Sequence, residues 1–232
     1  MSSNGVCVER PADVIPGVYK YCDDWCGRCP VTARCLSYRL RQERRARYGA
    51  DTYLTMSDMV AFTRDVAKAA GESTDALDAV LAGDPRREYQ PRPADEWLSD
   101  VAFRYGSAAA RFLRRSGWGA PMPDGPGASP SPLEVLAWYH LLVATRSGRA
   151  LISLARGQRG CAGDLEDALG CAKIAHISID RSLSALRVLA KQRPAGAIHQ
   201  LESMLRTLSV GLDTRVPGGR DFIRVGLDAP VV

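Results

Sequence analysis

Four cysteines lie close together near the start of the chain, at Cys22, Cys26, Cys29 and Cys35, with the spacing C-x3-C-x2-C-x5-C. Thiolates are soft ligands, and four of them can hold one zinc ion or one iron–sulfur cluster. Cysteines that serve only as small buried apolar side chains have no reason to cluster among charged neighbours in this way. The spacing therefore predicts a metal centre with these four cysteines as its ligands.

The intervals between the cysteines favour iron–sulfur chemistry over zinc. Structural zinc sites commonly use two C-x2-C pairs separated by a longer loop, whereas these intervals are short and unequal. A loop followed by a helix can wrap a cuboidal cluster, with Tyr21 and Trp25 as shields. Backbone amides at the helix start favour the negative charge of such a cluster. We therefore expect a 4Fe–4S cluster, with zinc as the alternative cofactor.

Residues 26–40 resemble the cluster-binding core of the WhiB-like iron–sulfur regulators. The shared pattern is C-x2-C-P-V, a third cysteine six positions on, and then Leu, a spacer and Tyr. The resemblance implies that Cys26, Cys29 and Cys35 ligate an oxygen- and nitric-oxide-sensitive 4Fe–4S cluster, and it suggests a role in transcription. The rest of the chain does not follow the family pattern. In the family a Gly-x-Trp-Gly turn comes soon after the cysteines, whereas the Gly-Trp-Gly sequence of this chain, at 117–119, lies far from them.

The fourth ligand has two candidates in the sequence. Cys22 lies only four positions before Cys26, whereas in the WhiB-like family the first cysteine lies far upstream, a distance that Cys7 matches better. We take Cys22 as the ligand and keep Cys7 as the alternative. Cys161 and Cys171 fall in or beside predicted helix and are expected to be core or bystander thiols.

Composition and charge indicate the compartment in which the protein acts and the class of its partners. The N-terminus has no basic stretch followed by an apolar one, and no apolar run is long enough to cross a bilayer. We expect a cytoplasmic protein without membrane association, whose clustered thiols stay reduced and serve metal binding. A net charge of +5, from 31 basic and 26 acidic residues, is too mild to indicate nucleic acid. We expect a protein redox partner, with nucleic acid as the less favoured alternative.

Helical periodicity covers most of the remaining chain. Trp97, Val101, Tyr105 and Phe112 recur at helical spacing and predict one apolar stripe, with Trp97 in the core. The run Ser-Pro-Leu-Glu at 131–134 predicts a capped helix start. The expected helices span 31–48, 57–70, 73–82, 95–116, 131–155, 164–193 and 195–212.

No segment alternates with a period of two, so the sequence predicts an all-α protein, a helical bundle with long antiparallel helices. We place an N-terminal cysteine-rich metal-binding loop-helix module at 1–50 and the bundle at 51–232.

Helical bundles can also hold metals between facing carboxylates and histidines. The candidates for such a second site are Glu134, His140, His176 and Asp180, of which the last two share a helix face. Glu134 has the capping role, and Asp180 fits an ion pair equally well. Three functions follow: a redox protein with a 4Fe–4S cluster, a structural zinc knuckle serving protein or DNA interaction, and a metal-dependent oxidoreductase with a second site in the bundle.

Overall fold

The computed structural model describes residues 13–49, 56–75, 78, 93–118, 129–160 and 163–229. Within these ranges the regular structure is helical, with an isolated bridge between Val225 and Ala229 and no β-strand. The all-α prediction is confirmed for this part of the chain. Most of the predicted short helix at 73–82, the Gly- and Pro-rich segment at 119–128, Cys7 and Cys161 lie outside the described residues.

The chain divides into two compact units. The N-terminal unit comprises Met1–Lys20, Cys29–Glu88 and Arg224–Val232, and the bundle unit comprises Tyr21–Arg28 and Tyr89–Ile223. The division expected at residue 50, between a cysteine-rich module and a helical bundle, stays a prediction. The short segment Tyr21–Arg28 belongs to the bundle unit although its chain neighbours on both sides belong to the N-terminal unit.

The N-terminal unit is built on α1 (Leu36–Tyr48) and α2 (Met56–Ala70). Leu36 and Leu40 of α1 pack with Val66 and Ala69 of α2 in one small apolar cluster. The helix predicted from residue 31 begins only at Leu36, because a 3-10 turn, η2 (Thr32–Arg34), and an extended Cys35 precede it. Gly49, with φ of 87°, ends α1 as predicted, since this backbone conformation strains side chains other than glycine.

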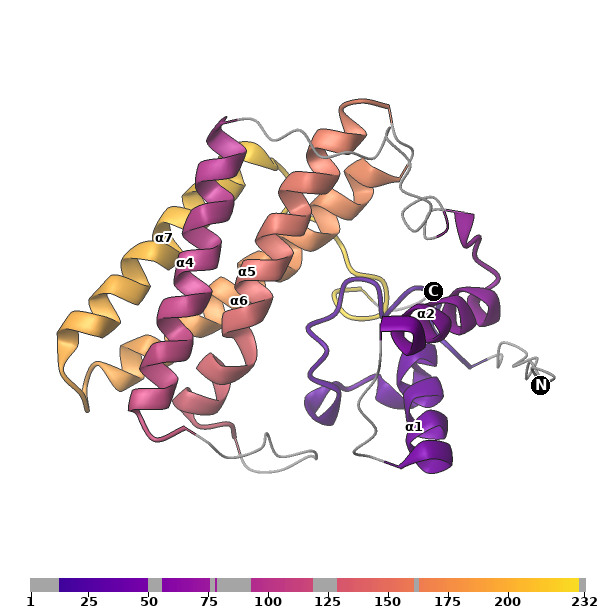
Figure 1. The fold of residues 1–232 in the computed structure, drawn as a ribbon, viewed down its shortest axis with the longest axis horizontal. Helices are drawn as coiled ribbons and strands as arrows, with labels where there is room; N and C mark the ends of the chain where they lie inside the picture. Colours follow the sequence, from indigo (N-terminus) through magenta and orange to yellow (C-terminus); the bar gives the residue numbers. More distant parts are fainter. Residues whose placement is uncertain are drawn as a thin grey trace. The chain divides into compact units, whose positions relative to one another are not determined.

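The bundle unit consists of α4 (Pro93–Arg115), α5 (Pro132–Gly157), α6 (Asp164–Leu189) and α7 (Ala195–Arg215). Figure 1 shows these helices side by side. Neighbouring helices run antiparallel: the Arg149 side chain of α5 meets Asp167 at the start of α6, whereas Tyr139 meets Arg181 near its end. The predicted bundle of long antiparallel helices is therefore confirmed.

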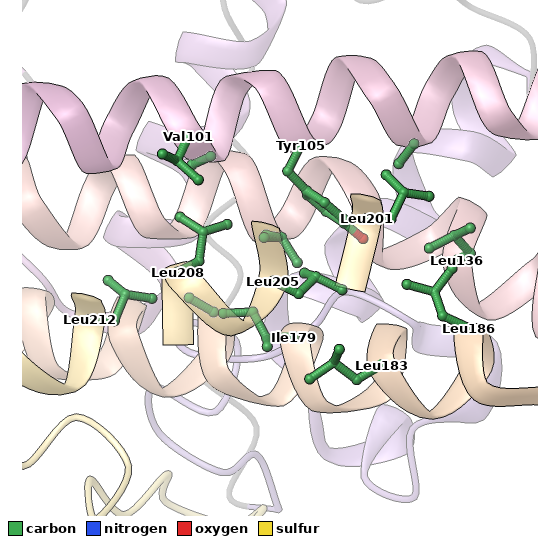
Figure 2. Close-up of a cluster of buried hydrophobic side chains, with 14 of the residues drawn as sticks. Val101, Tyr105, Leu136, Ile179, Leu183, Leu186, Leu201, Leu205, Leu208 and Leu212 are labelled. Atoms are coloured by element: carbon green, nitrogen blue, oxygen red, sulfur yellow. The ribbon is translucent and has the colours of Figure 1, made fainter. Parts of the chain in front are cut away.

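The apolar faces of these four helices meet in one continuous core. Figure 2 shows Tyr105 of α4 pointing toward Leu201 and Leu205 of α7, with Leu136 of α5 and Leu186 of α6 nearby. All five side chains are almost fully buried. Burial of such side chains is the main favourable contribution to folding, at about 1.5–3 kcal/mol each.

Local sequence signals account for several helix ends in the bundle. At the start of α5 the Ser131 hydroxyl accepts a hydrogen bond from the Glu134 amide at 3.3 Å, and the Glu134 carboxylate accepts one from the Ser131 amide. The predicted capping box is therefore present. Pro194 directly precedes α7, which begins at Ala195 as predicted.

The predicted apolar stripe of α4 is wrong in one position. Trp97 is 53% exposed, and the buried residue of that turn is Leu98, which is 1% exposed. The stripe continues through Val101, Tyr105 and Leu113. Leu98 fits the helical spacing as well as Trp97 does, so the periodicity alone does not show which of the two faces the core.

Candidate metal centre

Two of the four predicted ligands, Cys22 and Cys26, flank a tight turn in the bundle unit. Asp24 adopts the left-handed conformation with φ of 55°, which aspartate tolerates better than most residues. The Asp24 carbonyl accepts a hydrogen bond from the Cys26 amide at 2.8 Å, and the Cys22 Sγ lies 3.7 Å from Asp24 Oδ1. Both cysteines are half-buried. The turn thus constrains the backbone at Cys26 and gives the Cys22 thiol a partner in the Asp24 carboxylate.

The same turn is attached to the bundle through Asp23. Its Oδ2 accepts hydrogen bonds from the Tyr139 hydroxyl at 2.6 Å and from Arg181 at 2.8 Å, and its carbonyl accepts one from Trp138 Nε1 at 2.8 Å. Burial, together with the Asp23 carboxylate, raises the pKa of Tyr139 far above its usual range, so its hydroxyl stays a donor. The residues from α5 and α6 that hold the turn form no local motif, and sequence analysis missed them.

Aromatic stacking adds to this attachment. The Trp25 ring stacks on Trp138 with 5.1 Å between centroids and meets the edge of Tyr139 at 5.6 Å. Trp25 is buried, as its predicted shielding role requires. The Arg28 guanidinium lies over the Trp25 ring, 5.2 Å from its centroid. Trp25, the chain neighbour of Cys26, is therefore held by two aromatic rings of α5 and by a guanidinium.

Cys29 and Cys35 lie in the N-terminal unit. Cys29 is half-buried, and its carbonyl accepts a hydrogen bond from the Thr32 hydroxyl at 3.3 Å. Cys35 is buried beside Ile15 and Val18 and is the residue that immediately precedes α1. Its side chain makes no capping hydrogen bond, so the sulfur is not used to complete the helix.

Each unit thus contains two of the predicted ligands. Cys22 and Cys26 belong to the bundle unit, and Cys29 and Cys35 belong to the N-terminal unit. Among the described residues, no group of three or more His, Cys, Asp or Glu side chains is arranged to hold a metal ion. Cys171 is fully buried on α6, as the core prediction required, and burial raises the pKa of its thiol to about 11.

The bundle candidates Glu134 and His140 both have local partners on α5. The Glu134 carboxylate completes the capping box, and the hydrogen bond from the Ser131 amide, more than the nearby Arg28, lowers its pKa. The His140 Nδ1 lies 2.8 Å from the Ala137 carbonyl, and burial lowers the pKa of the ring. Glu134 and His140 therefore each have a local partner, and neither belongs to a metal-binding group among the described residues.

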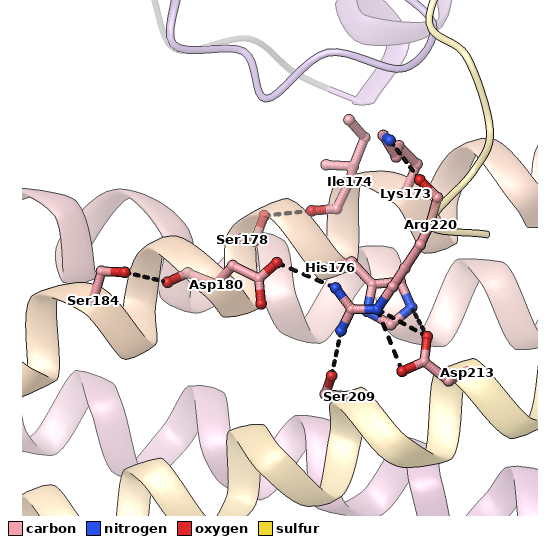
Figure 3. Close-up of polar contacts among 9 residues, drawn as sticks. All are labelled: Lys173, Ile174, His176, Ser178, Asp180, Ser184, Ser209, Asp213 and Arg220. Atoms are coloured by element: carbon pink, nitrogen blue, oxygen red, sulfur yellow. Dashed lines mark hydrogen bonds and ion pairs between the residues drawn. The ribbon is translucent and has the colours of Figure 1, made fainter. Parts of the chain in front are cut away.

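His176 and Asp180 do share one face of α6, but both face Arg220 from the segment after α7. Figure 3 shows the Arg220 guanidinium between Asp180 and Asp213, close to the His176 ring. Arg220 donates to Asp213 at 3.0 Å and to Asp180 at 3.2 Å. The two carboxylates are therefore compensated by a guanidinium. Asp180 does make an ion pair, but the pair is exposed and not buried, and its partner is Arg220, which lies after α7.

The buried His176 predicts a specific pH dependence of stability. Its ring is 2% exposed, and Nε2 lies 3.2 Å from Asp213 Oδ1 without hydrogen-bond alignment. Burial of the ring is the largest of the effects that lower the pKa of His176 from 6.5 to about 4, and the positive charges of Arg220 and Lys173 lower it further. The carboxylates of Asp213 and Asp180 raise it, but by less. Between these pH values the unfolded chain binds a proton that the folded chain does not. The free energy of unfolding should therefore fall as pH falls from 6.5 to 4.

We expect His176→Gln to flatten this part of the stability profile, measured by denaturant unfolding at several pH values. His199→Gln, on the exposed face of α7, is the matched control and should leave the slope unchanged. An unaltered slope in His176→Gln contradicts the assignment.

Comparison of the chain with protein-family models, with curated proteins and with solved structures finds no match in any of the three. None of the helices in the described part of the chain is both long and apolar enough to span a lipid bilayer.

Proposed function

We propose that the protein binds a 4Fe–4S cluster through Cys22, Cys26, Cys29 and Cys35 and has a redox role, either electron transfer to a partner protein or sensing of oxidants. The observation that carries the proposal is the spacing of four thiols within one short segment. The resemblance of residues 26–40 to the WhiB-like core supports three of the ligands. Cys7 remains the alternative to Cys22 as the fourth.

The surroundings of the cysteines suit a soft, negatively charged centre. Cys35 stands at the start of α1, where the free backbone amides and the helix dipole favour negative charge. Cys26 follows the buried Trp25, which limits access of water. Arg28 and Arg34 directly precede Cys29 and Cys35 in the chain, so two positive charges lie beside ligand positions.

A bound 4Fe–4S cluster supplies one-electron chemistry at a potential set by burial, charge and hydrogen bonds to sulfur. The chain's own residues contribute the thiol ligands, the aromatic cover from Trp25 and Trp138, and the arginines. An oxidant-sensing role uses loss of the cluster as the signal, whereas electron transfer requires a cluster that survives repeated cycles.

The identity of the metal tests the proposal directly. We expect protein purified anaerobically to be brown, with about four iron and four sulfide per chain, and its visible absorbance to bleach on reduction. Metal analysis and a visible spectrum of the same sample measure this. Colourless protein with one zinc per chain would identify the structural zinc knuckle instead, and protein with neither metal would rule out both.

A further inference from the structure

The bundle holds the turn that carries Cys22 and Cys26 at two places. Asp23 accepts hydrogen bonds from two helices, through Tyr139 of α5 and Arg181 of α6. Directly before Cys22, the Tyr21 ring and the Phe222 ring meet edge to face, with 5.1 Å between their centroids. A Cβ added to Gly170 would come within 2.3 Å of the Tyr21 ring, so the absence of a side chain at Gly170 makes room for it.

We infer that Tyr139 is a positioning residue for the metal centre, with Asp23 as the group through which it acts. Two contacts join Tyr139 to residues that lie beside the cysteines. Tyr139 donates to Asp23, which lies next to Cys22, and its ring meets Trp25, which lies next to Cys26. The inference rests on the proposed function, because it names the residues of the bundle that keep two of the ligands in place.

The burial of these groups explains why Tyr139 should hold Asp23 more strongly than Arg181 does. Tyr139 is fully buried, and the Asp23 side chain is 18% exposed, so the hydrogen bond between them is shielded from water. Arg181, by contrast, is 53% exposed, and its ion pair with Asp23 is weakened by solvent. Groups that orient metal ligands in this way typically change metal affinity by about 10- to 100-fold when removed.

The test compares Tyr139→Phe with Tyr105→Phe in the full chain loaded with iron and sulfide. Both tyrosines are fully buried, but Tyr105 lies among the leucines of the bundle core. We expect Tyr139→Phe to lose its visible absorbance to a chelator about 10-fold faster than wild type, and Tyr105→Phe to match wild type. Circular dichroism confirms that each variant is folded. Equal loss rates in Tyr139→Phe and wild type would overturn the inference.

A second readout needs no metal and separates this inference from the proposed function. In metal-free protein, the alkylation rate of Cys26 by iodoacetamide reports whether the turn is held on the bundle. We expect Tyr139→Phe and Asp23→Ala to raise this rate several-fold over wild type, while Asp23→Asn, which keeps an acceptor oxygen, has a smaller effect. If wild type binds no metal but the alkylation rates differ, the proposed function fails, and what stands is that Tyr139 holds the turn with Cys22 and Cys26 on the bundle. Equal alkylation rates overturn the positioning role whatever the metal result.

Discussion

Replacement of Cys26 by serine is expected to abolish the visible absorbance of anaerobically purified protein and to reduce bound iron at least 10-fold. A serine hydroxyl is a much harder and more weakly acidic ligand than a thiol, so it does not replace a thiolate in a soft metal site. Cys26 is the informative position because it belongs to the four-cysteine spacing and is a proposed ligand whether Cys22 or Cys7 is the fourth. Iron per chain and the visible spectrum are the measurements.

Cys171→Ala is the matched control for that experiment. Cys171 is fully buried on α6, and burial raises the pKa of its thiol to about 11, so the sulfur stays protonated at neutral pH and is a poor ligand. We expect this variant to keep its iron while losing some stability. Full iron retention in Cys26→Ser, or equal loss in the two variants, would contradict the assignment of the clustered cysteines as ligands.

Arg215→Met is expected to lower the free energy of unfolding of the bundle by about 3–5 kcal/mol. Asp95 on α4 is 1% exposed, and Arg215 at the end of α7 donates to both of its carboxylate oxygens, at 2.7 and 3.0 Å. Removal of the guanidinium leaves a buried carboxylate without its counter-charge. Denaturant unfolding followed by circular dichroism measures the loss.

Two further variants show whether the loss of stability comes from the buried Asp95 carboxylate that is left without a counter-charge. Arg104→Met removes an exposed pair with Asp100 on the same α4 helix and should cost less than about 1 kcal/mol. Adding Asp95→Leu to Arg215→Met should recover much of the stability, because it removes the unpaired carboxylate. An equal loss for Arg104→Met and Arg215→Met would show that burial of Asp95 does not decide the effect.

The helices were predictable because their ends are encoded locally. The capping box at Ser131 and Glu134 and the glycine at Gly49 fall where the helices begin and end. The extended Cys35 was not foreseen, since helical periodicity alone does not show where a preceding 3-10 turn gives way to α1. Trp97 was misplaced for a related reason, because side-chain size does not decide which of two neighbouring apolar residues faces the core.

The contacts that hold the candidate site depend on distant parts of the chain. Asp23 looks like a spacer between two cysteines in the sequence, yet it meets Tyr139 from 116 positions away. Arg220 lies beyond the last helix that the sequence predicts, yet it binds Asp180 and Asp213. Pairings of this kind arise from the packing of whole helices, and one sequence contains no signal for them.

X-ray absorption at the metal edge of the anaerobically purified protein tests the central claim most directly. If the thiolates of residues 22, 26, 29 and 35 surround one iron–sulfur centre, the first shell contains only sulfur, at about 2.3 Å, and iron neighbours follow beyond it. A first shell of nitrogen or oxygen would contradict the account, because it would place the metal away from the cysteines.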